Sequence, residues 1–380
     1  MTSALHIVSM AQTLDGGGSE RAMLRLASDW IGAGQRVTLV VGDGGGPLAR
    51  ELPAGADVRI LGDRRLRALC RLPDIARRVD ADIVFCPGNH YTGIAAWTRL
   101  RLSRDVPIVG KASNAMIRDD QSALVRWGYR RWLAMHPLFL DHVVALTPAL
   151  ADEVIATMGL AGDRVTVIPN SPVRRTEGGV SEVALPEQPF VLGVGRLTAQ
   201  KRWDRLIAAM PALGDVPLLI LGEGPLRPAL AAQARMLGVD LRLPGYVGDP
   251  GPALAAAAVT ALTSDYEGSP GVLREALAVG TPVVATRSSG AIDEIIASPA
   301  YGSVVPGADG AMLIATLRHW LDPATPRPVP VPEPGGDSAI RYLQLFDTLR
   351  QDRENRERSG CAAATAGSTA IAASAATSRG

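Results

Sequence analysis

Short apolar runs alternate with amphipathic helical stretches along most of this chain, and turns rich in Gly, Pro or Ser separate them. The runs ALHIVSM, ADIVFCPG and HVVALTP show little alternation of polar and apolar residues, which is typical of strands buried on both faces. Strands of this kind pair in parallel, and helices form the crossover connections between them. The pattern therefore predicts an α/β protein with doubly wound parallel sheets.

The alternating pattern occurs in two blocks, and a chain of 380 residues is long enough for two domains. We predict an N-terminal Rossmann-like domain over residues 1–172, a linker over 173–188 and a C-terminal Rossmann-like domain over 189–325. A proline-dense connector then leads to a last helix over 338–352. Residues 353–380, which are rich in Ala, Ser and Thr, are predicted to be a disordered tail.

Composition narrows the class of protein and its location. The formal net charge is +1, which gives no reason to expect nucleic acid as a partner. The three cysteines are far apart and form no Cys-x-x-Cys pair, so free thiols in a reducing compartment are favoured over disulfides or a zinc site. No apolar run approaches the ~18 residues that span a bilayer, and no secretion signal is evident at the N-terminus. We therefore predict a cytoplasmic protein.

Four glycine-containing turns follow successive apolar runs of the second block: GVGRLTAQK, GEGP, PGYVGD and DYEGSPG. In open α/β sheets such turns lie at the carboxyl ends of strands, where backbone N–H groups and helix N-termini bind anions. Arg196 supplies a guanidinium fork and Lys201 a point charge for one anion, such as a diphosphate. Lys201 and Lys111 are the two lysines of the chain. An ordinary turn with solvated basic residues is the alternative for any single one of the four.

Two glutamates stand around the last of these turns. Glu267 precedes a helix that we expect to begin near Val272, so it faces the space beyond the strand ends, whereas Glu275 is expected on the first helical turn. A carboxylate accepts hydrogen bonds from two adjacent hydroxyls, which suits the recognition of ribose or hexose. The alternative for Glu275 is an acid that complements the positive end of the helix dipole.

The segments GRLTAQKRWDRLI, LGEGPL, PGYVGD and YEGSPGVLREALAVGTPVVAT resemble, in order and spacing, the nucleotide-sugar half of glycosyltransferase family 4, a family of retaining GT-B enzymes. DGGGSERAMLRLA resembles the family's N-terminal glycine loop and helix, and IPNSP resembles its inter-domain hinge. The resemblance implies a GT-B fold, in which an acceptor-binding and a nucleotide-sugar-binding domain face a cleft. A C-terminal helix would cross back to the N-terminal domain, and we expect Ile340, Leu343, Phe346 and Leu349 to form its packing side.

The same resemblance assigns roles to individual residues. It implies that Arg196 and Lys201 bind the diphosphate, that Glu267 contacts the transferred sugar and that Glu275 holds the ribose. A histidine near the sugar usually follows the family's fourth strand, and His90 occupies this place, with turn stabilisation as its alternative role. The remaining implied contacts are backbone approaches at Gly16, Gly17 and Gly195, phosphate caps at Gly271 and Val272, and residues flanking the base at Tyr246 and Val247. Two residues depart from the family pattern. Arg202 stands where glycine is common, and Ser269 stands where an apolar residue is common.

These expectations together predict a retaining hexosyltransferase that uses a nucleoside-diphosphate sugar and a glycan or lipid-linked saccharide acceptor. No Asp-x-Asp stands in a strand-end loop, and we predict neither a metal nor another cofactor. A GT-B epimerase or phosphorylase, and a catalytically silent nucleotide-sugar binding protein, are the alternatives. The basic and aromatic stretch SALVRWGYRRWLAMHPLFL suits either a core helix or a surface resting on anionic lipid, so peripheral contact with the inner face of the membrane stays open.

Overall fold

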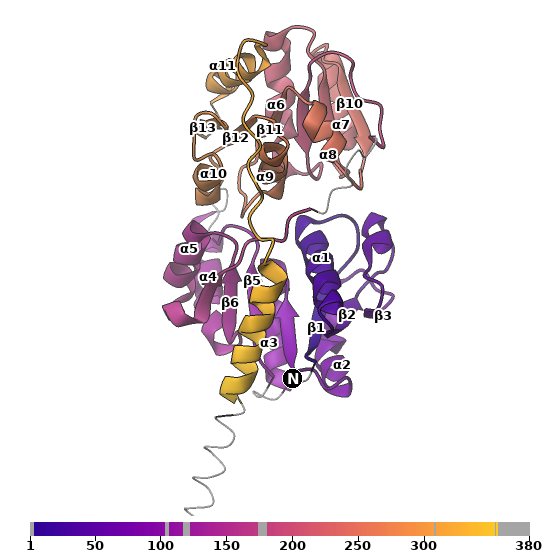
Figure 1. The fold of residues 1–380 in the computed structure, drawn as a ribbon, viewed down its shortest axis with the longest axis vertical. Coiled ribbons are helices and arrows are strands. Elements are labelled where there is room, and N and C mark those ends of the chain that lie inside the picture. The colour runs from indigo at the N-terminus through magenta and orange to yellow at the C-terminus, as the bar shows by residue number, and fades with distance from the viewer. Residues whose placement is uncertain are drawn as a thin grey trace, which may run out of the picture.

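The structure, a computed structural model, describes residues 4–102, 106–116, 122–173, 181–307, 309–353 and 355. Two parallel α/β sheets lie one above the other along the long axis of the molecule, and helices flank each sheet (Figure 1). Both family expectations about the fold, doubly wound sheets and a GT-B arrangement, are confirmed.

The N-terminal sheet has seven strands in the order β3-β2-β1-β4-β5-β6-β7. Their bounds are β1 His6–Ala11, β2 Arg36–Val41, β3 Asp57–Ile60, β4 Ile83–Cys86, β5 Ile108–Ala112, β6 His142–Ala145 and β7 Val165–Val167. The helices of this part are α1 Gly18–Gly32, α2 Leu72–Arg78, α3 Thr92–Arg101, α4 Ala123–Leu133 and α5 Pro148–Met158. The strand order changes direction between β1 and β4.

The C-terminal sheet has six strands in the order β10-β9-β8-β11-β12-β13. Their bounds are β8 Val191–Val194, β9 Leu218–Leu221, β10 Leu241–Gly245, β11 Val259–Leu262, β12 Val283–Thr286 and β13 Gly302–Val305. The helices are α6 Trp203–Ala209, α7 Arg227–Met236, α8 Gly251–Ala256, α9 Gly271–Ala278, α10 Gly290–Ile295 and α11 Gly310–Leu321. Here the strand order changes direction between β8 and β11.

Burial of the strands agrees with the sequence pattern that predicted them. Every residue of β4, β9, β11 and β12 is buried. Helices cover both faces of these inner strands, so neither face is left to be polar and their apolar runs need no alternation, whereas the edge strands β3 and β10 have exposed residues. The chain thus confirms the link between continuous apolar runs and a parallel sheet.

A C-terminal helix over residues 338–353 packs against the N-terminal sheet and α1, as Figure 1 shows. Tyr342 and Phe346 are buried there together with Trp30 of α1 and Phe85 of β4. The ring centroid of Trp30 lies 5.4 Å from that of Phe346 and 5.8 Å from that of Tyr342, in edge-to-face arrangements. The predicted crossing back to the N-terminal part is therefore confirmed.

Two details of the helix predictions were wrong. Ile340 is 60% exposed, and Tyr342 takes the central buried place beside Phe346. The buried stripe is rotated from the predicted one because the aromatic rings fill the space against Trp30. Glu275 is the fifth residue of α9, one residue further into the helix than expected and just past its first turn, since that helix begins at Gly271. Residues 174–180 of the predicted linker and 356–380 of the predicted tail lie outside the described residues.

The aromatic cluster makes a prediction about stability. Phe346→Ala should lower the free energy of unfolding by about 3–5 kcal/mol, because it leaves a cavity among buried rings. Ile340→Ala, on the exposed side of the same helix, should change it by less than about 0.5 kcal/mol. Urea unfolding of both variants measures the difference, and equal effects would contradict the packing of this helix.

Candidate functional site

The two changes in strand order place four loops at one location. In each sheet the strand order reverses between two neighbouring strands. The loops that follow these two strands diverge, which opens a crevice at the carboxyl ends of the strands. These strands are β1 and β4 in one sheet and β8 and β11 in the other. A cleft of about 560 Å³ between the sheets is lined by the loops that follow β1, β8 and β11, among others.

Nearly all of the residues singled out from the sequence line this cleft. They are Gly16, Gly17, Gly195, Arg196, Lys201, Tyr246, Val247, Glu267, Gly271, Val272 and Glu275. They come from both sheets and are up to 259 positions apart, as from Gly16 to Glu275. His90 alone among the predicted site residues is not part of this lining.

A nearly buried ion pair lies in the C-terminal half of the cleft. The Lys201 ammonium is 2.6 Å from Oε1 of Glu267, and the Ser264 hydroxyl donates to the same oxygen over 2.5 Å. Only 15% of the Lys201 side chain and 9% of the Glu267 side chain are exposed, so each charge depends on the other for compensation. Within the described residues no hydrogen bond is formed by Oε2, which leaves that oxygen available to a ligand hydroxyl.

Arg196 differs from Lys201 in having its charge free. Its side chain is exposed and lines the cleft, and no carboxylate of the described chain pairs with its guanidinium. Arg202, by contrast, forms ion pairs with Asp204 and Asp265 and has left-handed backbone angles, φ 49° and ψ 41°. That conformation explains why glycine suits this position. The guanidinium of Arg202 is thus neutralised by ion pairs within the protein, whereas that of Arg196 faces the cleft.

The N-terminus of α9 also points into the cleft. Gly271 and Val272 of its first turn line the cleft, and no side chain caps the helix. Free backbone N–H groups and the helix dipole favour an anion at this end. The preceding turn touches the other sheet, because a Cβ on Gly268 would lie 2.3 Å from the carbonyl oxygen of Ser113. Only glycine allows this close approach, which brings the loop after β5 to the same end of α9.

His90 lies beside the cleft, directly after β4 as predicted, in a 3-10 turn over Asn89–Tyr91. Its Nε2 is 3.6 Å from Oε1 of Glu20, and its ring centroid is 3.7 Å from that of Tyr91. Burial lowers the pKa of His90, with Glu20 opposing this change and the charge of Arg196 adding to it. The imidazole is therefore neutral at pH 7, and Arg196 of the C-terminal part lies near enough to act on it.

The structure adds polar residues that sequence reasoning did not assign to the site. They are Arg21, Arg25, Lys111, Ser113, Asn114 and Asn170, and all line the N-terminal side of the cleft. Lys111 is 3% exposed and its Nζ is 2.6 Å from Oδ1 of Asn170. Burial, followed by the charge of Arg25, lowers the pKa of Lys111 to about 7. The rarity of lysine in the chain was the only sequence signal for this residue.

Other features of the described chain carry less chemistry. No group of three or more His, Cys, Asp or Glu side chains is arranged to hold a metal ion in the part that the structure describes. The helices described there include none long and apolar enough to cross a membrane. In α4, Leu124, Val125 and Trp127 are exposed, while Leu133 is buried. This helix therefore combines an outward apolar and basic surface with a contact to the core.

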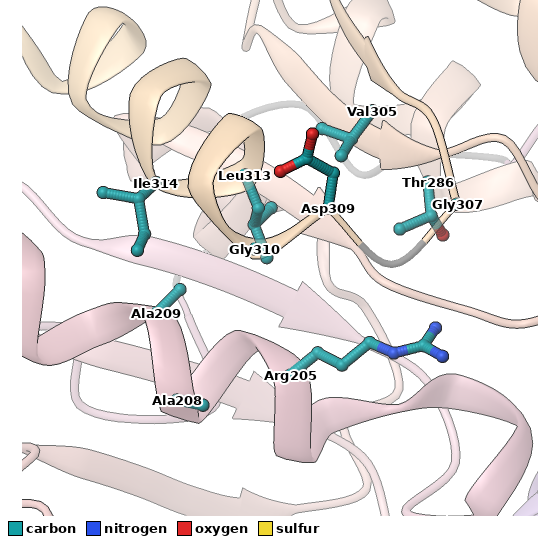
Figure 2. Close-up of a pocket in the computed structure, with 10 residues that line it drawn as sticks. All are labelled: Arg205, Ala208, Ala209, Thr286, Val305, Gly307, Asp309, Gly310, Leu313 and Ile314. Atoms are coloured by element: carbon teal, nitrogen blue, oxygen red, sulfur yellow. The ribbon is translucent and has the colours of Figure 1, made fainter.

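A second cavity of about 180 Å³ lies in the C-terminal part, between α6 and α11 (Figure 2). Its lining is mostly aliphatic, and the charged side chains drawn there are Arg205 and Asp309. Arg205 is already paired with Asp265 at 2.7 Å. Because this cavity shares no residue with the large cleft, it plays no part in the site described here.

Comparison with known families gives two matches along the chain. Residues 16–171 match the family described as Glycosyltransferase Family 4, and residues 188–322 match Glycosyl transferases group 1. Together they span well over half of the chain. The first match covers β2 to β7 of the N-terminal sheet and leaves out β1, and the second covers all six strands of the C-terminal sheet.

Curated relatives agree with these matches. The lipopolysaccharide core biosynthesis glycosyltransferase LpsE of Rhizobium meliloti is 35% identical over 155 residues, which are 40% of this chain and 45% of the relative. The GDP-mannose-dependent alpha-(1-6)-phosphatidylinositol dimannoside mannosyltransferase of Mycobacterium tuberculosis is 34% identical over 180 residues, 42% of this chain and 46% of the relative. The matched region thus spans less than half the length of either relative.

Solved structures share the fold at low sequence identity. TarM of S. aureus superposes with a TM-score of 0.67 at 12% identity and covers 91% of this chain and 96% of its own. Anabaena HepE, solved in complex with UDP and glucose, superposes with a TM-score of 0.65 at 18% identity and covers 93% of this chain and 100% of its own. From the two family matches and this shared fold we conclude that the chain belongs to the family 4, group 1 glycosyltransferases of the GT-B fold.

Proposed function

We propose that this glycosyltransferase moves a hexosyl unit from a nucleoside-diphosphate sugar to a glycan or lipid-linked saccharide, with retention of configuration. The observation that carries the proposal is the group of positive elements on one cleft wall: Arg196 without a carboxylate partner, Lys201, and the uncapped N-terminus of α9. Three such elements favour a diphosphate, which carries several negative charges. The UDP bound in the HepE structure is consistent with a ligand of this class.

In this proposal the positive groups also do the catalytic work. When the bond between the sugar and the diphosphate breaks, negative charge grows on the leaving phosphate oxygen, and groups already oriented toward it stabilise that charge. The leaving oxygen then accepts the proton of the attacking acceptor hydroxyl on the same face of the sugar. Of the other acids that line the cleft, Asp15 is paired with Arg64 and Glu223 with Arg227, and Glu275 is assigned to the ribose, so the proposal needs no protein nucleophile.

Glu267 and Glu275 have different duties in the same proposal. Oε2 of Glu267 accepts from hydroxyls of the transferred hexose, while Lys201 and Ser264 hold the carboxylate through Oε1. Glu275, one turn into α9, accepts from the ribose hydroxyls. His90, neutral and beside the cleft, is proposed to contact the hexose from the N-terminal side. Gly16 and Gly17 let the backbone after β1 approach the donor phosphates and the acceptor.

The acceptor is proposed from the relatives and from one helix. The names of the two curated relatives mention lipopolysaccharide core and phosphatidylinositol dimannoside, both of which are glycolipids or parts of them. The outward face of α4 carries Trp127 at 63% exposure and Leu124 at 77%, close to several arginines in the sequence. Such a surface favours peripheral contact with anionic lipid. We therefore propose cell-surface polysaccharide or glycolipid synthesis.

Slow donor hydrolysis tests the proposed activity. We expect that incubation with a panel of UDP-, GDP- and ADP-sugars releases free sugar from at least one donor without added metal, and that the released sugar initially keeps the donor's anomeric configuration. NMR of the fresh products measures both outcomes. Tight binding of a donor without any turnover, with or without candidate acceptors, would instead indicate a silent binding protein.

The two cations make separate predictions. Arg196→Ala should weaken nucleoside-diphosphate binding by roughly 1.5–3 kcal/mol, because a charge-assisted contact is lost, and should leave the melting temperature unchanged. Lys201→Ala should weaken binding and also lower the melting temperature, since it leaves the Glu267 carboxylate nearly buried without its cation. Calorimetric titration and thermal unfolding measure these effects. Unchanged affinity in both variants would remove these residues from the donor site.

The two glutamates should differ in how they affect rate and affinity. Glu267→Gln should lower turnover far more than affinity for free nucleoside diphosphate, which lacks the hexose, because contacts to the reacting sugar sharpen in the transition state. Glu275→Gln should weaken both. Steady-state kinetics and titration of each variant give the comparison, with melting temperature as control. Near-normal transfer by Glu267→Gln would be incompatible with its proposed role.

A further inference from the structure

Tyr246, which follows β10 in the C-terminal part, is bound by two side chains of the N-terminal part. Its hydroxyl donates to Oε1 of Glu51 over 2.8 Å, and Nη2 of Arg21 lies 2.9 Å from the same oxygen. Arg21 also hydrogen-bonds to the Tyr246 hydroxyl, and its guanidinium carbon is 5.1 Å from the centroid of the tyrosine ring. The three side chains therefore form a closed set of contacts between the two parts of the molecule.

These contacts join segments that are far apart in the sequence. Arg21 is the fourth residue of α1, and Glu51 ends the 3-10 helix Pro47–Glu51, whereas Tyr246 is 195 positions beyond Glu51. The tyrosine ring lies over the glycine loop, because a Cβ on Gly16 would be 3.1 Å from it. Arg21 and Tyr246 line the cleft, but Glu51 does not. Glu51 can therefore act on a bound ligand only through its two partners.

The charges of the set suit a lasting contact. Arg21 and Glu51 compensate each other, and their side chains are 21% and 33% exposed. Burial raises the pKa of Tyr246 to about 12, the charge of Arg21 opposes this change and the bond to Glu51 supports it. The phenol thus stays protonated at neutral pH and remains a donor to the carboxylate. A cation facing an aromatic ring adds a further attraction that partial burial strengthens.

We propose that Glu51 and Arg21 are positioning residues for the donor base: they fix the Tyr246 ring against the Gly16 loop, in the place where a bound base would pack on it. This inference rests on the proposed function, in which Tyr246 flanks the base. A nucleoside base that packs on Tyr246 meets a ring already held in place, so less ordering cost falls on binding. The ligand's diphosphate is held by other residues and does not need this arrangement.

A structural bridge without this duty would behave differently. Removing it would lower stability slightly and would leave the relative affinities of different ligands unchanged. The discriminating quantity is the base-dependent part of the affinity, which is the ratio of the dissociation constants of inorganic diphosphate and of a nucleoside diphosphate. Positioning through Tyr246 changes this ratio, because inorganic diphosphate has no base to place on the ring.

The experiment compares Glu51→Gln, Tyr246→Phe and the double variant in the full chain. UDP, GDP and ADP are first titrated into the wild type, and the tightest of them is then titrated into each variant alongside inorganic diphosphate. Asp240→Asn serves as the matched control, since Asp240 forms a 3.0 Å ion pair with Arg242 within the C-terminal part. Melting temperature reports whether each variant is folded. If Glu51→Gln folds poorly, Tyr246→Phe still tests the proposal, because it keeps the ring and its packing.

We expect each single variant to lower the base-dependent ratio about tenfold, as loss of one hydrogen bond to a charged group implies. The double variant should lower it no further than either single one, because both substitutions act on the same bond: Gln removes the charge of its acceptor, and Phe removes its donor. The control should leave the ratio unchanged. An unaltered ratio in both single variants, equal losses for both ligands, or additive effects would overturn the positioning role. If none of the three nucleoside diphosphates binds the wild type, the proposed function falls, and this inference with it.

Discussion

The site depends on one constraint, the reversal of strand order in each parallel sheet. At β1 and β4, and at β8 and β11, the reversal sends neighbouring loops in opposite directions and leaves the carboxyl ends of these strands uncovered. Because the two sheets present these ends to a common cleft, residues as distant as Gly16 and Glu275 line the same space. The cleft is thus lined by loops and helix ends, while buried strands hold those loops at fixed positions.

Charge is distributed unequally over the cleft walls, and this distribution gives the site its chemistry. The C-terminal wall pairs Lys201 with Glu267 and leaves Arg196 free, so that one cation orients an acid while another faces the ligand. The N-terminal wall contains Lys111, which hydrogen-bonds only a neutral amide oxygen within the described chain, and its pKa is lowered to about 7 by burial. Holding such groups away from water costs stability, and sites that bind anions are where this cost is commonly found.

Two kinds of contact hold the parts of the molecule together around the cleft. The C-terminal helix crosses to the N-terminal sheet, buries Phe346 against Trp30 and is tied near its start by a 2.7 Å bond from the Ser338 hydroxyl to the carbonyl oxygen of Pro169. The crossing chain and the segment after β7 are therefore fastened to each other. The contacts of Tyr246 with Glu51 are of the other kind, since they are polar. A large apolar contact keeps the parts associated, and a small polar one holds a single ring at the cleft.

The sequence by itself determined most of the strands, without the edge strands β3 and β13, and it determined most of the C-terminal wall, because apolar runs and glycine turns report local backbone structure directly. It also placed Glu267, Arg196 and Lys201 at strand ends, where the turn chemistry is visible in adjacent residues. Only the tertiary structure decided that Lys111 bonds Asn170, that Glu51 meets Tyr246 and that Tyr342 rather than Ile340 faces the core. Helical periodicity leaves the exact rotation of a helix open by about one residue. Contacts between segments 59 or 195 positions apart depend on how whole sheets and helices pack, which no local pattern records.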